Sequence, residues 1–259
     1  SFRGERPRFA QHRSLFLKSE NYKNLKMFGR KIWKVWCRMT GDYLRDPKEI
    51  YRQSFATILK EADLSKLPED IADLTVRLIH ACGMPDIVED LVFTPDAAQA
   101  GYAALLKGAP VLCDSRMVAE GIIRSRLSAN NEVKCWNNHP ECAPLADKME
   151  TTLSAAAVEF WRPQLAGAVV AVGNAPTTLF RLLEILAEGV EPPAVIFGFP
   201  VGFIGAAESK ELLVKQCVGA VPFLTLSGRR GGSAMAAAAV NALAKKAEIS
   251  VANNINIQS

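Results

Sequence analysis

Arg77 and His80 are the residues whose types and spacing best suit acid–base chemistry. They stand three residues apart in a segment with helical periodicity, so both side chains leave one face of the predicted helix. The apolar neighbours Leu78 and Ile79 would partly desolvate the imidazole and bring its pKa into a working range. A single histidine on a half-apolar helix is more often an ordinary core residue, but a cation one turn away weakens that alternative, because a buried Arg also needs an anion. His80 is therefore the candidate proton donor and acceptor.

Four polar turns, each after a predicted strand and before a predicted helix, form the second group of candidates: residues 113–115, 173–177, 198–205 and 227–233. The helices that follow present free backbone N–H groups and a positive dipole end, which favour an anion. Short turns of this kind are often glycine-rich for conformational reasons alone. Three such turns at one sheet edge, one of them with paired arginines, favour a polyanionic small molecule instead. The candidate binding residues in these turns are Asn174, Arg229, Arg230 and Ser233.

Six cysteines are scattered along the chain without a Cys-x-x-Cys pair. This pattern is unlike that of a disulfide scaffold and fits reduced thiols in a cytoplasmic protein. Cys135, His139 and Cys142 form the one cluster of interest, but a zinc site there would need a fourth ligand and better spacing. The sequence therefore predicts no metal site.

The elements that must position these groups alternate along the chain. A helix start at Asp46-Pro47 opens a helical periodicity that runs to Ala62, and a second helix is predicted from Pro68 to a stop at Gly83. Strands are expected beyond it at 109–113, 132–136, 168–172, 194–197 and 222–226. Helices are expected at 117–123, 145–160, 177–187, 206–216 and 233–247. Short apolar strands separated by helices predict an α/β fold with a doubly wound parallel sheet, in which ligands bind at the carboxyl ends of the strands.

The positive charge of the chain is concentrated at its amino-terminal end. The net charge is +4, whereas residues 1–41 hold eleven Lys and Arg against two acids, so this segment carries +9 and the remainder −5. The asymmetry belongs to the segment, so it is poor evidence for a nucleic-acid partner. We expect residues 1–41 to be a poorly ordered basic extension, with an organelle-targeting leader as the alternative. Residues 42–248 are then the folded domain and 249–259 a tail.

Membrane insertion is not expected from the composition. Hydrophobic residues make up 49% of the chain, which fits a folded domain with a sizeable core. The apolar runs are far too short to cross a bilayer. No membrane partner is therefore predicted.

A series of ordered motifs resembles the precorrin-8X methylmutase family, of which the cobalt-precorrin-8 methylmutase of the anaerobic route is a homologue. They are residues 51–55 (YRQSF), 77–83 (RLIHACG), 110–114 (PVLCD), 173–177 (GNAPT), 200–203 (PVGF) with 206–210 (AAESK), and 231–235 (GGSAM). The resemblance covers about residues 42–245, nearly all of the predicted domain, and such a series in this order is specific.

The resemblance implies a three-layer, flavodoxin-like α/β/α fold, a homodimer, and no cofactor or metal in the protein itself. It also implies that a methyl group migrates from C-11 to C-12 of an anionic tetrapyrrole, which gives hydrogenobyrinate in cobalamin biosynthesis. Carried onto this chain, the family's catalytic histidine is His80, and its substrate-binding Ser and Arg are Ser54 and Arg77. Many relatives carry an Arg before the segment 154–157, where this chain has Leu153.

Two other classes of function stand beside this isomerase. A tetrapyrrole carrier would need the cationic rim but no titratable group at the ring, so His80 separates it from the enzyme. A flavodoxin-like nucleotide or flavin binder is disfavoured, because none of the glycine-rich turns has the spacing of a phosphate-binding fingerprint. The sequence leaves open whether the substrate is metal-free or bears cobalt, because the metal would sit in the ligand.

Overall fold

The computed structural model describes residues 43–127 and 129–244. By its contacts the chain divides into two units, residues 1–50 and 51–259. In the first unit, residues 43–50 hold the beginning of helix α2 (Pro47–Glu61), where the Asp46 carboxylate accepts a hydrogen bond from the Lys48 backbone N–H at 3.0 Å. The expected extension 1–41, the tail 249–259 and the last residues of the expected domain, 245–248, lie outside the described residues.

The second unit alternates helices and strands. After α2 come α3 (Glu69–Cys82), the 3₁₀ helix η1 (Pro85–Asp90), β1 (Leu91–Phe93) and α4 (Ala97–Leu106). Next are β2 (Val111–Cys113), α5 (Arg116–Gly121), η2 (Arg124–Arg126), β3 (Val133–Lys134), α6 (Cys142–Lys148), α7 (Leu153–Ala157) and η3 (Val158–Gln164). The last are β4 (Val169–Val172), α8 (Pro176–Ala187), β5 (Val195–Gly198), α9 (Ala206–Cys217), β6 (Phe223–Leu226) and α10 (Ser233–Ala244). As predicted, α3 ends at Gly83, whose φ of 69° is left-handed and suits glycine.

Six strands form one sheet in the order β1-β6-β5-β4-β2-β3. The five predicted strands are parallel, as expected. The sixth, β1, corrects the all-parallel prediction: it pairs antiparallel with β6, with Leu91 opposite Leu226. Three residues are too few to show a strand period, so the sequence pattern misses this strand. β3 is added to one side of β2, and β4, the next strand along the chain, is added to the other side. The direction in which strands are added therefore reverses between β2 and β4.

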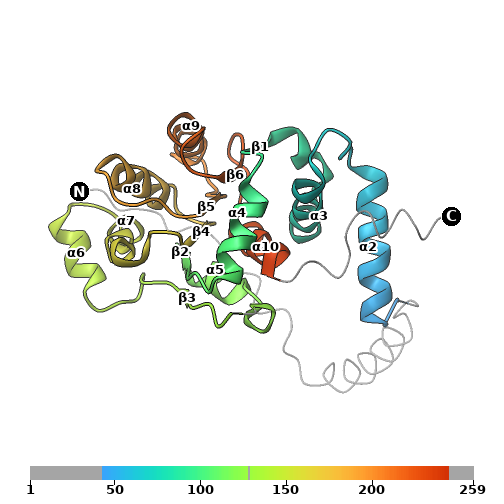
Figure 1. Cartoon of the computed structure of the whole chain (residues 1–259), viewed down its shortest axis with the longest axis horizontal. Coiled ribbons are helices and arrows are strands. Elements are labelled where there is room, and N and C mark those ends of the chain that lie inside the picture. Colours follow the sequence, from blue (N-terminus) through green and yellow to red (C-terminus); the bar gives the residue numbers. More distant parts are fainter. Residues whose placement is uncertain (1–42, 128, 245–259) are drawn as a thin grey trace, which may run out of the picture. The chain divides into compact units, whose positions relative to one another are not determined.

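Helices cover both faces of the sheet, with α7, α8 and α9 on one side and α4, α5 and α10 on the other (Figure 1). Successive residues of β4 alternate between two cores. Val169 and Ala171 join the core with α3, α4, α5 and α10, whereas Val170 and Val172 join the core with η3, α8 and α9. All four side chains are buried, which explains why the strand reads as a continuous apolar run.

Helix α4 is missed by the sequence pattern because its residues are small. It packs closely on α10: a Cβ added at Gly101 would lie 2.6 Å from Cδ1 of Leu243. Small side chains permit this approach without giving a strong apolar stripe.

The single helix predicted at 145–160 is wrong. The chain there forms α6, α7 and η3, and Glu150 between α6 and α7 has a φ of 51°, which no helix accommodates. Thr152 caps α7, because its hydroxyl accepts a hydrogen bond from the Ala155 N–H at 3.2 Å. Both α6 and α7 contribute to one small apolar cluster, so the apolar spacing continues across the break and hides it.

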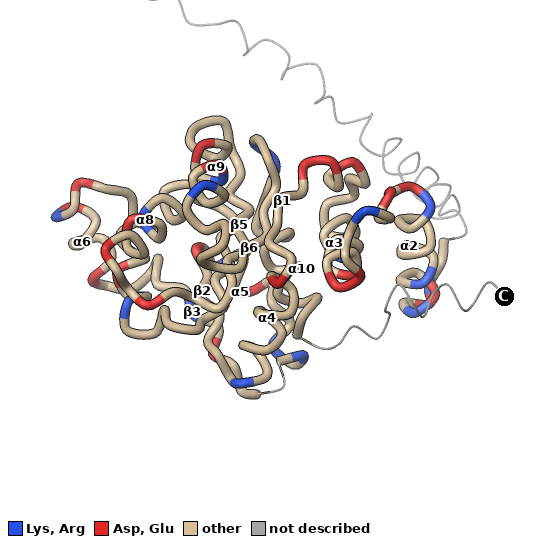
Figure 2. Tube along the Cα trace, turned by 45° about the horizontal axis from the view of Figure 1, so that its top comes forward, with Lys and Arg blue, Asp and Glu red and all other residues tan. Residues whose placement is uncertain are grey.

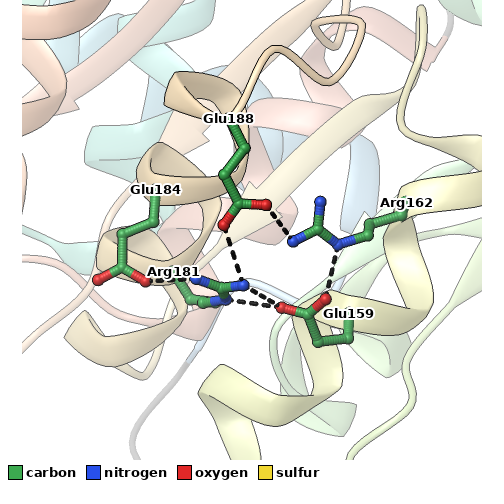
Figure 3. Close-up of polar contacts among 5 residues, drawn as sticks. All are labelled: Glu159, Arg162, Arg181, Glu184 and Glu188. Carbon is green, nitrogen blue, oxygen red and sulfur yellow. Dashed lines mark hydrogen bonds and ion pairs between the residues drawn. The ribbon is translucent and has the colours of Figure 1, made fainter.

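Two arginines and three glutamates join η3 to α8 (Figure 3). Glu159 binds Arg162 and Arg181, each at 2.6 Å. Glu188 binds the same two arginines at 2.6 and 3.2 Å, and Glu184 binds Arg181 at 2.7 Å. Burial raises the pKa of Glu159, but the hydrogen bonds from the two arginines outweigh it and hold the pKa below its ordinary value. The shared carboxylate therefore ties the short η3 segment to α8.

We expect Glu159→Gln to lower the free energy of unfolding by about 1–2 kcal/mol at neutral pH, because two charge-assisted bonds are lost from a partly exposed site. A carboxyl whose folded pKa is depressed stabilises the fold above its unfolded pKa and loses that effect as the pH falls through the folded value. The variant should therefore lose less stability in acid than the unaltered protein. Urea unfolding of the variant and the unaltered protein, at neutral and at acidic pH, measures both effects. Glu184→Gln, at a side chain 60% exposed, is the control, and equal losses in the two variants would contradict the account.

Candidate functional site

His80 lies in the last turn of α3, beside three residues of α2. Its Nδ1 is 2.8 Å from Oγ of Ser54. The rings of Tyr51 and Phe55 each have their centroid 5.2 Å from that of the imidazole, and the Arg77 guanidinium lies over the Phe55 ring at 5.3 Å. The structure thus brings together Ser54, Arg77 and His80 and adds Tyr51 and Phe55. The i, i+3, i+4 spacing of 51, 54 and 55 is the signal that could have identified the two aromatic residues.

The pKa of His80 lies below its ordinary value, first because partial burial disfavours the imidazolium and second because Arg77 repels it. The residue still has a large exposed surface, so the ring is accessible from solvent. In the imidazolium form, Nδ1–H donates to Ser54 Oγ and Nε2 carries the proton that can be transferred. The arrangement is that of an oriented imidazole which releases a proton readily.

A buried carboxylate, that of Asp114, organises the turn between β4 and α8. Its residue is 1% exposed. Oδ1 accepts a hydrogen bond from Gly173 N–H at 2.9 Å, and Oδ2 accepts from Asn174 and Ala175 N–H, each at 2.8 Å. Burial raises the pKa of this carboxyl, and the three N–H groups oppose that rise. The N–H groups of Gly173, Asn174 and Ala175 therefore have an acceptor within the protein. The anion site expected at the amino-terminal end of α8, which begins at Pro176, stays a prediction.

Asn174 and Ser233 lie in turns that meet where the strand order reverses. A Cβ on Gly173 would lie 2.7 Å from Cα of Ser233, so these two turns are in direct contact. The Ser233 hydroxyl is 3.4 Å from that of Ser115, which caps α5 by accepting a hydrogen bond from Val118 N–H. The Asn174 side chain is exposed and Ser233 is half-buried. Both residues thus lie at the carboxyl edge of the sheet.

The two arginines of the turn 227–233 differ in their partners. Arg230 binds Asp86 at 2.7 Å and approaches Asp90 at 3.6 Å, so acids of η1 already neutralise much of its charge. The acidic stretch of η1, between α3 and β1, is red in Figure 2. Arg229 instead lies over the ring of Phe203, at 5.4 Å, and that ring is 86% exposed. Arg229 is therefore the better placed of the two to meet an external anion.

Segment η1 connects the His80 cluster to the arginine turn. Asp86 follows His80 by six residues, a span of roughly 20 Å at most, and its carboxylate holds Arg230. Leu153 is the first residue of α7, and Thr152 before it has its hydroxyl 2.8 Å from that of Thr177 on α8. The Leu153 position, at which the family resemblance leads us to expect an Arg, thus lies beside the turn 173–177.

The cysteine cluster has ordinary packing partners. The Cys135 thiol donates to the Asn137 side chain at 3.6 Å, and the Cys142 thiol donates to the Leu153 carbonyl at 3.3 Å. Within residues 43–127 and 129–244, no three His, Cys, Asp or Glu side chains are grouped so that they could hold a metal ion. No helix in those ranges has both the length and the apolar character of a membrane span.

Fold and site together define the class: an α/β protein whose polar, glycine-rich turns lie at the carboxyl edge of a mostly parallel sheet, where small molecules bind in such folds. The family model described as precorrin-8X methylmutase matches residues 49–246. The chain belongs to this family, which confirms the resemblance found in the sequence.

Individual relatives agree with that assignment. A precorrin-8X methylmutase of Pseudomonas aeruginosa is 59% identical over 207 residues, covering 80% of this chain and 99% of the relative. One from Sinorhizobium sp. is 53% identical, covering 79% and 97%. The crystal structure of a precorrin-8X methylmutase from Thermus thermophilus superposes with a TM-score of 0.69 at 36% identity, covering 76% of this chain and 94% of that one. The described sheet and its turns lie within the matched part.

We expect Asp114→Asn to lower the free energy of unfolding by about 2–4 kcal/mol, because an amide NH₂ would then face backbone N–H donors in a buried site. Asp96→Asn is the matched control, since Asp96 is exposed and its side chain makes no capping bond to α4. Urea unfolding of both variants measures the difference. A loss for Asp114→Asn no larger than that of the control would mean that the carboxylate does not hold the turn.

The imidazole of His80 should titrate below its ordinary pKa of about 6.5. Arg77→Met keeps an apolar stem and removes the repulsion, so the pKa should rise toward the ordinary value. NMR titration of the His80 ring, assigned with His80→Asn, measures this directly. Lys60→Met, a charge loss at an exposed position of α2, should leave the titration where it was. If the pKa of His80 is unchanged in Arg77→Met, Arg77 does not contribute to lowering it.

Proposed function

We propose that this chain catalyses the migration of a methyl group from C-11 to C-12 of precorrin-8X, giving hydrogenobyrinate in cobalamin biosynthesis. The observation that carries the proposal is the Ser54–His80 hydrogen bond beside Arg77, in a chain of the precorrin-8X methylmutase family. The relatives from Pseudomonas aeruginosa and Sinorhizobium sp. are both named for precorrin-8X. Their names favour the metal-free substrate over its cobalt-bearing counterpart.

The methyl migration needs one general acid–base group in the protein. The shift breaks one C–C bond and makes another within a conjugated macrocycle, so neither a nucleophile nor a redox partner is required. A proton given to the macrocycle by the His80 imidazolium redistributes its π electrons and prepares the two carbons for migration. The product is an isomer of the substrate, so the proton returns to the imidazole afterwards. Ser54 fixes the orientation of the ring, and a lowered pKa makes the imidazolium a stronger acid.

The carboxylates of the tetrapyrrole are the groups that the polar side chains bind. In this proposal Ser54 and Arg77 contact the substrate near His80, and Asn174, Arg229, Arg230 and Ser233 contact it at the sheet edge. Arg229 is the principal cation there, because Arg230 shares its charge with Asp86.

We also propose the finer features that the family resemblance implies. Taken in chain order, the five parallel strands have the spatial order 2-1-3-4-5, which supports a three-layer, flavodoxin-like fold. A homodimer is supported by Phe203 and Ile204, large apolar side chains that are 86% and 90% exposed. The active protein is proposed to be cytoplasmic, without nucleic-acid or membrane partners, and residues 42–248 to suffice for folding and activity.

His80→Asn tests the proposal. Turnover should fall by about 10²-fold or more if the imidazole transfers the proton in the rate-limiting step. Affinity for hydrogenobyrinate should be largely retained, because other groups bind the carboxylates. If the imidazolium is the donor, turnover of the unaltered protein should fall as the pH rises through the His80 pKa, and the variant should lack that dependence.

His139→Asn is the control, because His139 is exposed and its ring contacts Phe160, away from the α2–α3 cluster. Full turnover in His80→Asn would contradict the catalytic role. Lost affinity together with lost turnover would make His80 a binding residue instead. Binding without turnover in the unaltered protein would support the tetrapyrrole carrier.

A further inference from the structure

Lys210 of α9 is a buried cation beneath the turn 227–233. Its residue is 1% exposed, and burial lowers the pKa of its ammonium to about 8. Its Nζ donates a hydrogen bond to the Arg230 carbonyl at 2.6 Å. Between the residues that the structure describes, no carboxylate lies within 4 Å of this ammonium; Asp90 acts on it only from farther away.

Burying an ammonium without an ion-pair partner is strongly unfavourable, because the protein interior replaces water around the charge. An apolar side chain of similar length would fill the same space at a lower free-energy cost. Packing alone therefore does not explain a lysine at this position. Its hydrogen bond to the turn is the interaction that an apolar side chain could not make.

The turn 227–233 is otherwise held by backbone hydrogen bonds on its two sides. Gly202 N–H donates to the Arg229 carbonyl at 3.3 Å, and Gly232 N–H donates to the Phe199 carbonyl at 2.8 Å. Gly231 passes so close to the neighbouring turn that a Cβ there would overlap the Phe199 carbonyl oxygen. Between these anchors, the Arg230 carbonyl has Lys210 as its donor.

We propose that Lys210 is a positioning residue: its ammonium fixes the Arg230 carbonyl and thereby the backbone from which Arg229 and Arg230 meet the carboxylates of the substrate. The proposal rests on the function proposed above for those two arginines. Asp90 of η1 is the charged group that acts on Lys210, and Asp86, Asp90 and Cys82 act on Arg230, whose carbonyl Lys210 binds. Loss of a proton from Lys210 weakens the bond to the carbonyl, so the turn should loosen as the pH rises through about 8.

Lys210→Met keeps the length of the side chain and removes the donor. Lys215→Met, on the exposed face of the same helix, is the matched control. Amide hydrogen exchange at residues 228–232 of the full chain should become faster in Lys210→Met only. Affinity for hydrogenobyrinate and KM for precorrin-8X should each worsen about tenfold, with kcat within about twofold of the unaltered protein.

Unchanged exchange in a folded Lys210→Met would overturn the positioning role. Faster exchange with unchanged affinity would overturn the link to the substrate. If Lys210→Met does not fold, the positioning role is tested by comparing Lys210→Arg with the unaltered protein. Exchange at 228–232, corrected for its intrinsic pH dependence, should then increase above pH about 8 in the unaltered protein but not in the Arg variant, and a flat profile would overturn the proposal. The role of Lys210 and the role of the two arginines can fail separately. Unchanged affinity after joint replacement of Arg229 and Arg230 by Ala would contradict the binding role proposed for the arginines. It would leave the hydrogen-exchange result for Lys210 as it stands.

Discussion

The buried carboxylate of Asp114 accepts hydrogen bonds from three successive backbone N–H groups, those of Gly173, Asn174 and Ala175. This constraint holds the turn after β4 against α10, where the contact between Gly173 and Ser233 leaves no room for a side chain. The three donors to Asp114 precede Pro176, the first residue of α8, so the carboxylate fixes the backbone of the turn itself. In the proposed function, the arginine turn and the α2–α3 cluster bind carboxylates of the substrate, together with the side chains of Asn174 and Ser233.

The cations of the site have different electrostatic roles. Arg230 is paired with acids of η1, which offset part of its charge, whereas Arg229 lies over the exposed Phe203 ring. Burial lowers the pKa of His80, and repulsion from Arg77 lowers it further. In the proposed reaction, a substrate carboxylate that pairs with Arg77 would offset this repulsion and favour protonation of the imidazole. Substrate binding and proton delivery would then be coupled through a single guanidinium.

Local patterns were enough to predict α3, its end at Gly83, the five parallel strands and the shared face of Arg77 and His80, because each depends on residues close in the chain. The antiparallel β1 and the break at Glu150 were missed, since the first is very short and the second lies within continuous apolar spacing. The Asp114 bonds and the Arg230–Asp86 pair join residues 59 to 144 positions apart. Such partners are set by tertiary packing, which no local pattern contains.

The proposed function requires that the chain move a methyl group and not merely bind the tetrapyrrole. The most direct measurement uses precorrin-8X labelled with ¹³C in its C-11 methyl group, incubated with the full chain and followed by NMR and by the visible spectrum. We expect the label to appear on C-12 as the spectrum changes to that of hydrogenobyrinate. A label that stays on C-11 while the tetrapyrrole remains bound would contradict methyl migration by this chain.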